Sequence, residues 1–156
     1  MKRAFTMIEL IFVIVIIGIL AAVAMPKLAA TRGEAEAAVC VHEVGQLIRE
    51  ISTRYAKDGN KNFKTLGIED MTNIVTNATT DGLTKGIAEA GTTTVETGIT
   101  YLCDGVSIVT IISADSGADY NLTVSATDSN TPASQIAKEK IIKNVLNGLS
   151  TKNFVL

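Results

Sequence analysis

The sequence predicts an α+β fold: one long N-terminal α-helix packs by its second half on a small antiparallel β-sheet, and a C-terminal helix follows. Three observations lead to this prediction. An apolar N-terminal run continues into an amphipathic segment of helical period. Three segments rich in β-branched residues are separated by short turns, and a Thr-Pro pair opens a second helical pattern near the C-terminus.

The composition limits the possible functions. The chain has 156 residues, enough for one modest globular domain beside an N-terminal segment. Its formal net charge of −2 gives no basic surface for nucleic acid. With 4% aromatic residues and no tryptophan, it also lacks a platform for stacking bases. We therefore expect no nucleic-acid binding.

The first element is an apolar segment, Phe5–Met25, that is long enough to cross a bilayer. As a helix it would measure about 31 Å at ~1.5 Å per residue. It is apolar on every face, which excludes an amphipathic helix lying on a membrane surface. Lys2 and Arg3 precede it and favour a cytoplasmic N-terminus, so the rest of the chain would lie on the outer side.

Glu9 is the exception within this apolar run. A charge in hydrocarbon costs roughly 2.5–3.5 kcal/mol even on the lenient insertion scale. Two alternatives leave the acid unexplained: a plain single-pass anchor, and a removable secretory signal cut after Ala24 at a small-x-small site. We therefore expect Glu9 to have a partner that an isolated chain in the membrane does not provide.

The helical pattern continues beyond the apolar run to about Lys57. Gly18 and Pro26 interrupt this pattern. Pro26 predicts a kink near Ala22, because proline removes a backbone hydrogen-bond donor and clashes with the preceding turn of the helix. Beyond Pro26, apolar residues recur at spacings of three and four and should face the sheet. These residues are Ala37, Cys40, Val44, Leu47, Ile48, Ile51 and Tyr55. Turn residues at Lys57–Asn62 then end the helix.

The next segment gives a weak signal, with a short helix expected over 68–75 and loop elsewhere as far as Gly98. Three β-branched segments follow, at 98–103, 106–114 and 119–126. Hairpin-type turns separate them, which predicts an antiparallel sheet of at least three strands packed on the long helix.

The last element is a helix over 131–149. Thr131 is expected to start it, with Pro132 in its first turn. Its apolar residues lie on one face: Ile136, Ala137, Ile141, Val145 and Leu149.

The two cysteines do not suffice for a disulfide framework or a four-ligand metal site. Cys40 lies on the helix stripe and Cys103 ends a predicted strand. A bridge between them would tie the sheet to the helix and contribute about 4 kcal/mol in the chain-entropy model, provided that the domain is exported. The alternative is two buried free thiols that act as small hydrophobes.

The first 28 residues carry a specific motif: a short basic leader, a small residue, Phe-Thr-x-Ile-Glu-Leu, a long apolar run containing a glycine, and a closing proline. This motif resembles the N-terminus of type IV pilins and type II secretion pseudopilins. The resemblance implies a pilin-like fold, although a C-terminal helix is not a standard part of a pilin head.

The resemblance implies processing by a prepilin peptidase. The enzyme would cut between Ala4 and Phe5 and methylate the new amine of Phe5. The family usually has glycine before the cut, so Ala4 is a departure that keeps a small residue there. The chain would then consist of a leader (1–4), a transmembrane and assembly helix (5–26) and a periplasmic head (27–156).

The resemblance also implies a partner for Glu9. In the family, the glutamate at this place is thought to pair with the N-terminal amine of a neighbouring subunit. Phe5 and Glu9 are four residues apart, so a pair within one helix is the alternative. We favour the intermolecular pair, which would set the axial register of subunits during assembly.

The sequence thus favours a structural subunit of a type IV pilin-like filament, either a pseudopilin of a type II secretion system or a pilus subunit for adhesion, motility or DNA uptake. The expected partners are copies of the chain and other pilin-like subunits, the prepilin peptidase, an inner-membrane assembly platform and the lipid bilayer. The expected location is the bacterial inner membrane, with a periplasmic head, and then a periplasmic or extracellular filament.

Other chemistry finds little support in the sequence. We see no nucleophile–base pair, phosphate-binding loop or paired catalytic acids, and so expect no enzyme activity, metal or cofactor. Asp115–Asn121 faintly resembles a calcium loop, and Asn121 a bacterial glycosylation site, but a plain hairpin turn is favoured. An exported soluble binding protein with a signal peptide cut after Ala24 is the alternative of another class.

Overall fold

The computed structural model describes residues 5–63, 66–74, 76, 85–88, 94, 96–115, 120–127 and 130–156. The chain divides into two compact units, Met1–Gly33 and Glu34–Leu156, which we call the N-terminal unit and the head. A long helix, an antiparallel sheet and a C-terminal helix succeed one another along the chain. The predicted α+β class is confirmed.

Helix α1, Met7–Phe63, is the longest element. Its backbone keeps helical φ/ψ through Gly18 and Pro26, so the helix is unbroken there and a bend at Pro26 stays a prediction. Gly59 is the one described residue inside α1 with non-helical angles (φ 66°, ψ 172°), which glycine adopts without steric cost. It lies in the segment Lys57–Asn62 where the sequence ends the helix, but helical structure resumes after it and ends at Phe63.

Within the N-terminal unit, α1 exposes apolar side chains around its whole circumference. The exposed fractions of Phe12, Ile14 and Leu20 are 67%, 57% and 64%, and these residues point in different directions around the helix. This stretch is the one helix of the described chain that is long and apolar enough to cross a membrane, by length and composition only.

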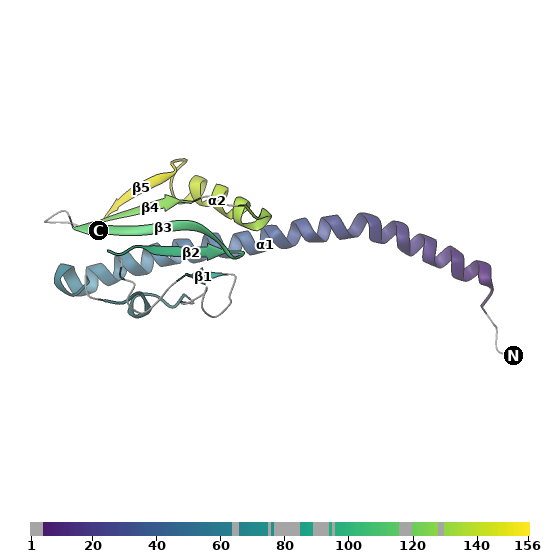
Figure 1. Cartoon of the computed structure of the whole chain (residues 1–156), viewed down its shortest axis with the longest axis horizontal. Coiled ribbons are helices and arrows are strands. Elements are labelled where there is room, and N and C mark those ends of the chain that lie inside the picture. The colour runs from purple at the N-terminus through teal and green to yellow at the C-terminus, as the bar shows by residue number, and fades with distance from the viewer. Residues whose placement is uncertain are drawn as a thin grey trace. The chain divides into compact units, whose positions relative to one another are not determined.

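Within the head, the second half of α1 runs along the sheet (Figure 1). The predicted apolar stripe is buried from Ala37 to Ile51. Tyr55, at its end, is partly buried and meets Phe63 edge-on, with ring centroids 5.3 Å apart. The helical period of the sequence therefore identified the face of α1 that packs on the sheet.

The sheet has five antiparallel strands in the order β1-β2-β3-β4-β5. Their bounds are β1 Gly86–Ile87, β2 Ile99–Cys103, β3 Val106–Asp115, β4 Tyr120–Ala126 and β5 Thr151–Val155. The three predicted strands correspond to β2, β3 and β4. The two edge strands were not predicted. Tyr101 pairs with Val109 whereas Leu102 pairs with Ser107, so the extra residue Ile108 forms a bulge in β3.

The two faces of the sheet differ in character. One face packs on α1 with buried residues such as Ile99, Ile111 and Val124. The other we call the outer face. It is formed by side chains that lie opposite one another on neighbouring strands: Thr100, Thr110, Ile112, Ala114, Asn121, Thr123, Ser125, Thr151, Asn153 and Val155.

Helix α2, Pro132–Asn144, begins as predicted. Thr131 is its N-cap and forms a capping box with Ser134, while Pro132 occupies the first turn. The predicted extension to Leu149 is wrong, because the helix ends at Asn144 and the chain turns back through Asn147 and Gly148 with positive φ. Leu149 is accordingly exposed.

Two further predictions fall in the loops. The helix expected over 68–75 is a single 3-10 turn, η1, at Ile68–Asp70, with Ile68 buried. The hairpin turn expected at Asp115–Asn121 lies largely outside the described residues, which omit 116–119. Asn121 itself lies on β4.

Candidate functional site

The start of α1 holds Glu9 in a capping box. The Glu9 carboxylate accepts hydrogen bonds from the backbone N–H of Thr6 at 2.8 Å and from the Thr6 hydroxyl at 2.7 Å. The backbone N–H of Glu9 donates to Thr6 Oγ1 at 3.3 Å. Thr6 is thus the N-cap and Glu9 the third helical residue, the arrangement that satisfies otherwise unpaired donors at a helix start.

Thr6 is a residue that the sequence reasoning missed. The Thr-x-x-Glu spacing from Thr6 to Glu9 is the usual sequence signal of a capping box and could have identified it. The interaction uses the backbone amide and the hydroxyl of Thr6, both of which exist before and after a cut at Phe5. The intermolecular and intrahelical pairs of Glu9 with an amine at Phe5 both stay predictions, and Ala4 lies outside the described residues.

The apolar surface that follows Glu9 is not covered by any described residue of the N-terminal unit. Side chains from Leu10 to Leu28 are exposed on every side of the helix, Met25 to 67%. Contiguous apolar surface of this extent is unusual on a soluble monomer and marks a surface that enters lipid or other protein.

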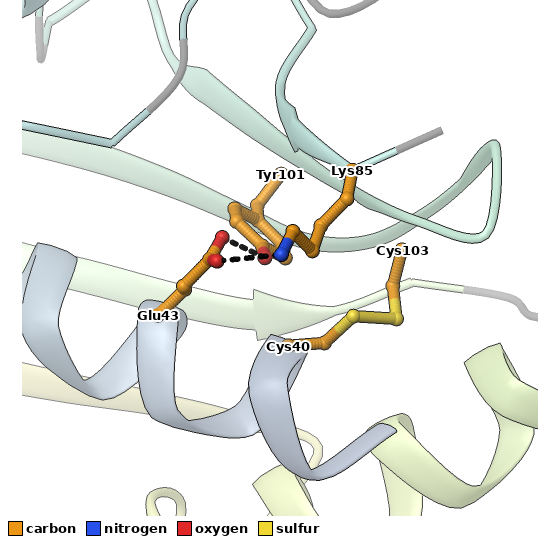
Figure 2. Close-up of polar contacts among 5 residues, drawn as sticks. All are labelled: Cys40, Glu43, Lys85, Tyr101 and Cys103. Atoms are coloured by element: carbon orange, nitrogen blue, oxygen red, sulfur yellow. Dashed lines mark hydrogen bonds and ion pairs between the residues drawn. A yellow bond between two sulfur atoms is a disulfide. The ribbon is translucent and has the colours of Figure 1, made fainter. Parts of the chain in front are cut away.

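Within the head, a disulfide between Cys40 of α1 and Cys103 of β2 joins the helix to the sheet, as Figure 2 shows. The two Cα atoms lie 5.9 Å apart, and the bridge closes a loop across 63 positions of sequence. This is the bridged alternative of the two that the sequence left open. It joins the first buried turns of α1 to the end of β2.

A polar cluster lies one helical turn further along α1 (Figure 2). The hydroxyl of the fully buried Tyr101 donates to Glu43 Oε2 at 2.6 Å, and Lys85 Nζ lies 3.0 Å from Glu43 Oε1. Burial, the hydrogen bond to Glu43 and its negative charge all raise the pKa of Tyr101, so the phenol stays neutral. One carboxylate therefore connects α1, β2 and the residue that precedes β1.

Glu50 makes a second connection, between α1 and the segment after η1. It accepts hydrogen bonds from the Thr72 hydroxyl, from the Asn73 backbone N–H at 3.3 Å and from the Gln46 amide at 2.8 Å. Partial burial opposes ionisation, but the hydrogen bonds from Thr72, Gln46 and Asn73 outweigh it and lower the pKa of Glu50. The carboxylate is therefore charged at neutral pH.

A cavity of about 280 Å³ lies beside Glu50, between α1 and the η1 segment. It is lined by Arg49, Glu50, Thr53, Arg54, Lys57, Asp70, Met71 and Asn73. The lining mixes both signs of charge, and Arg54 is paired with Asp58. Within the described residues, no group of three or more His, Cys, Asp or Glu side chains could hold a metal ion.

Comparison with known proteins gives one match, confined to the N-terminus. Residues 1–25 match the prokaryotic N-terminal methylation motif, the signal carried by type IV pilins and pseudopilins. No curated protein and no solved structure matches the chain. The motif supports the class of type IV pilin-like prepilin peptidase substrates, and together with the apolar helix it is consistent with anchoring in a membrane.

Proposed function

We propose that this chain, which carries the methylation motif at residues 1–25, is a structural subunit of a type IV pilin-like filament. A prepilin peptidase would remove residues 1–4 and methylate Phe5. The mature subunit would wait in the inner membrane with its head in the periplasm and then enter the filament. Its role is structural rather than enzymatic.

The observation that carries this proposal is the uncovered apolar surface of α1, most of which lies within the matched motif. Such a surface is stable in lipid, where the helix satisfies its own backbone hydrogen bonds. It is equally well buried against copies of the same helix, because apolar neighbours replace lipid chains. On transfer from the membrane to the filament, the apolar surface of the helix exchanges lipid neighbours for the helices of other subunits. It is therefore buried in both states.

The disulfide supports export of the head. Disulfides persist in oxidising compartments such as the bacterial periplasm and are rare in the cytosol. The Cys40–Cys103 bridge thus agrees with the orientation that Lys2 and Arg3 favour, with the N-terminus in the cytoplasm and the head outside.

Glu9→Ala tests the assembly role. The variant should be processed at Phe5 nearly as well as the wild type but enter filaments at least about tenfold less, because the acid no longer selects the register of neighbouring subunits. Glu34→Ala is the matched control, since Glu34 is an exposed glutamate on the same helix beyond the apolar run. If the Glu9→Ala variant enters filaments as well as the wild type, Glu9 does not set the register of neighbouring subunits.

Cell fractionation distinguishes the two kinds of filament. A subunit recovered by shearing intact cells belongs to a surface pilus for adhesion, motility or DNA uptake. A subunit that stays with the cell envelope, and whose deletion blocks protein secretion, is a pseudopilin of a type II secretion system. The N-terminal motif is common to both, so this distinction depends on the head.

A further inference from the structure

The outer face of the sheet carries no charged side chain among its described residues. Direct cross-strand pairs define it: Thr110 lies opposite both Thr100 and Ser125, and Thr123 lies opposite both Ile112 and Asn153. Charged residues make up 19% of the chain, and a solvent-facing surface is usually richer in charge than the chain average. Depletion of charge is the compositional mark of the centre of a protein interface.

The polar groups of this face are partly paired with one another. The Thr123 hydroxyl donates to Asn153 Oδ1 at 2.9 Å, and the Thr151 hydroxyl donates to Ser125 Oγ at 3.2 Å. A partner that covers this face therefore finds the Thr123 and Thr151 hydroxyls already donating, which lowers the cost of burying them. Ile112 and Val155, 44% and 71% exposed, provide apolar surface on the same face.

The size of the face indicates what kind of partner it fits. Four strands and three rows of side chains cover on the order of 300 Å² at the usual strand and residue spacings. A stable complex buries about 800 Å² on each partner, so this face alone is too small to hold a free protein. It can hold a partner that another contact already keeps close, because tethering raises the effective concentration.

We propose that the outer face is a contact surface for the head of a second copy of this chain, placed beside it by the assembled N-terminal helices. The inference rests on the proposed filament role, which supplies the tether. It adds a specific surface of the head, formed by β2 to β5, to the contacts made by the helix.

Photo-cross-linking of the full-length chain in cells tests the contact. A photoreactive amino acid in place of Thr110 or Thr123 should yield a covalent dimer of the chain, identified by mass spectrometry of the adduct. The control position is Gln135, an exposed residue of α2 away from this face. An adduct with a different protein, no adduct, or an equal yield of dimer from Gln135 would overturn the proposal.

Substitution of a charged residue into the outer face tests the contact independently. Thr110→Lys and Val155→Lys should each reduce incorporation into filaments by about tenfold, because the contact would bury an unpaired charge. Gln135→Lys should leave incorporation unchanged. Wild-type incorporation of both face variants overturns the contact alone, whereas absence of processing at Phe5 in the wild type overturns the filament role and this inference with it.

Discussion

Ser113 shows that the core of the head is not fully optimised. Its side chain is buried on β3, and its hydroxyl has no hydrogen-bond partner within the part of the chain that the structure describes. A buried hydroxyl without a partner loses its hydrogen bonds to water on folding and gains none in return.

Ser113→Ala should therefore stabilise the head by about 1 kcal/mol. Ser107→Ala is the matched control, because the hydroxyl of Ser107 lies 3.2 Å from that of Thr127 and its loss should give no gain. Denaturant unfolding of the detergent-solubilised full chain measures both. A Ser113→Ala protein less stable than the wild type would show that the hydroxyl has a partner after all.

Glu50 makes the stability of the folded head depend on pH. Its pKa is lowered in the folded head by hydrogen bonds that outweigh the effect of burial, so the stability it contributes is present above its ordinary value of 4.5. This contribution is lost as the pH falls through the lower, folded-state pKa.

Glu50→Gln should therefore be less stable than the wild type at pH 7 and approach it as the pH drops below about 4. Unfolding free energies of both proteins across pH 3 to 7 give the difference directly. The control is Glu34→Gln, because Glu34 is an exposed glutamate on the same helix. A Glu50→Gln penalty that is independent of pH would contradict this role for ionised Glu50.

The pair Thr6 and Glu9 shows the limit of reasoning from residue type. The sequence identifies Glu9 as anomalous because a carboxylate is costly in hydrocarbon. The family resemblance implies an amine at Phe5 as its partner, which stays a prediction, and the structure adds the neighbouring amide and hydroxyl of Thr6. Tyr101 and Glu43 were missed for another reason: 58 positions separate them, and no local pattern predicts such a pair.

At the scale of elements, the predictable parts are those with strong local patterns. The stripe of α1 follows the helical period, and β2 to β4 are rich in β-branched residues. Strand β5 contains Thr and Val but has only five residues and is defined by its pairing with β4, while β1 has only two residues. Pairing across the chain, rather than propensity, decides such edge strands.

The Cys40–Cys103 bridge holds α1 and β2 together and should be present in the mature protein. Alkylation without reductant should label neither cysteine, and the Cys40→Ser/Cys103→Ser variant should lose about 4 kcal/mol of stability in the chain-entropy model. Mass spectrometry of the non-reduced protein and denaturant unfolding measure the two effects. Two alkylated thiols in freshly isolated protein would contradict the bridge.

At the scale of the whole molecule, the chain combines two units with different environments. The head has one core, to which α1, the sheet and α2 all contribute. The N-terminal unit exposes apolar side chains instead, and its burial must come from lipid or from other subunits. The proposed function follows from this contrast and from the methylation motif at residues 1–25, which includes most of the apolar run.

The mature N-terminus tests this account most directly. Intact-mass and N-terminal peptide mass spectrometry of the protein extracted from membranes should show a chain that begins with N-methylated Phe5 and retains the whole apolar helix. A chain that begins at Met25 would instead indicate a cleaved secretory signal, and a chain that keeps Met1 would show that no prepilin peptidase acts on it. Either of these results would contradict the account.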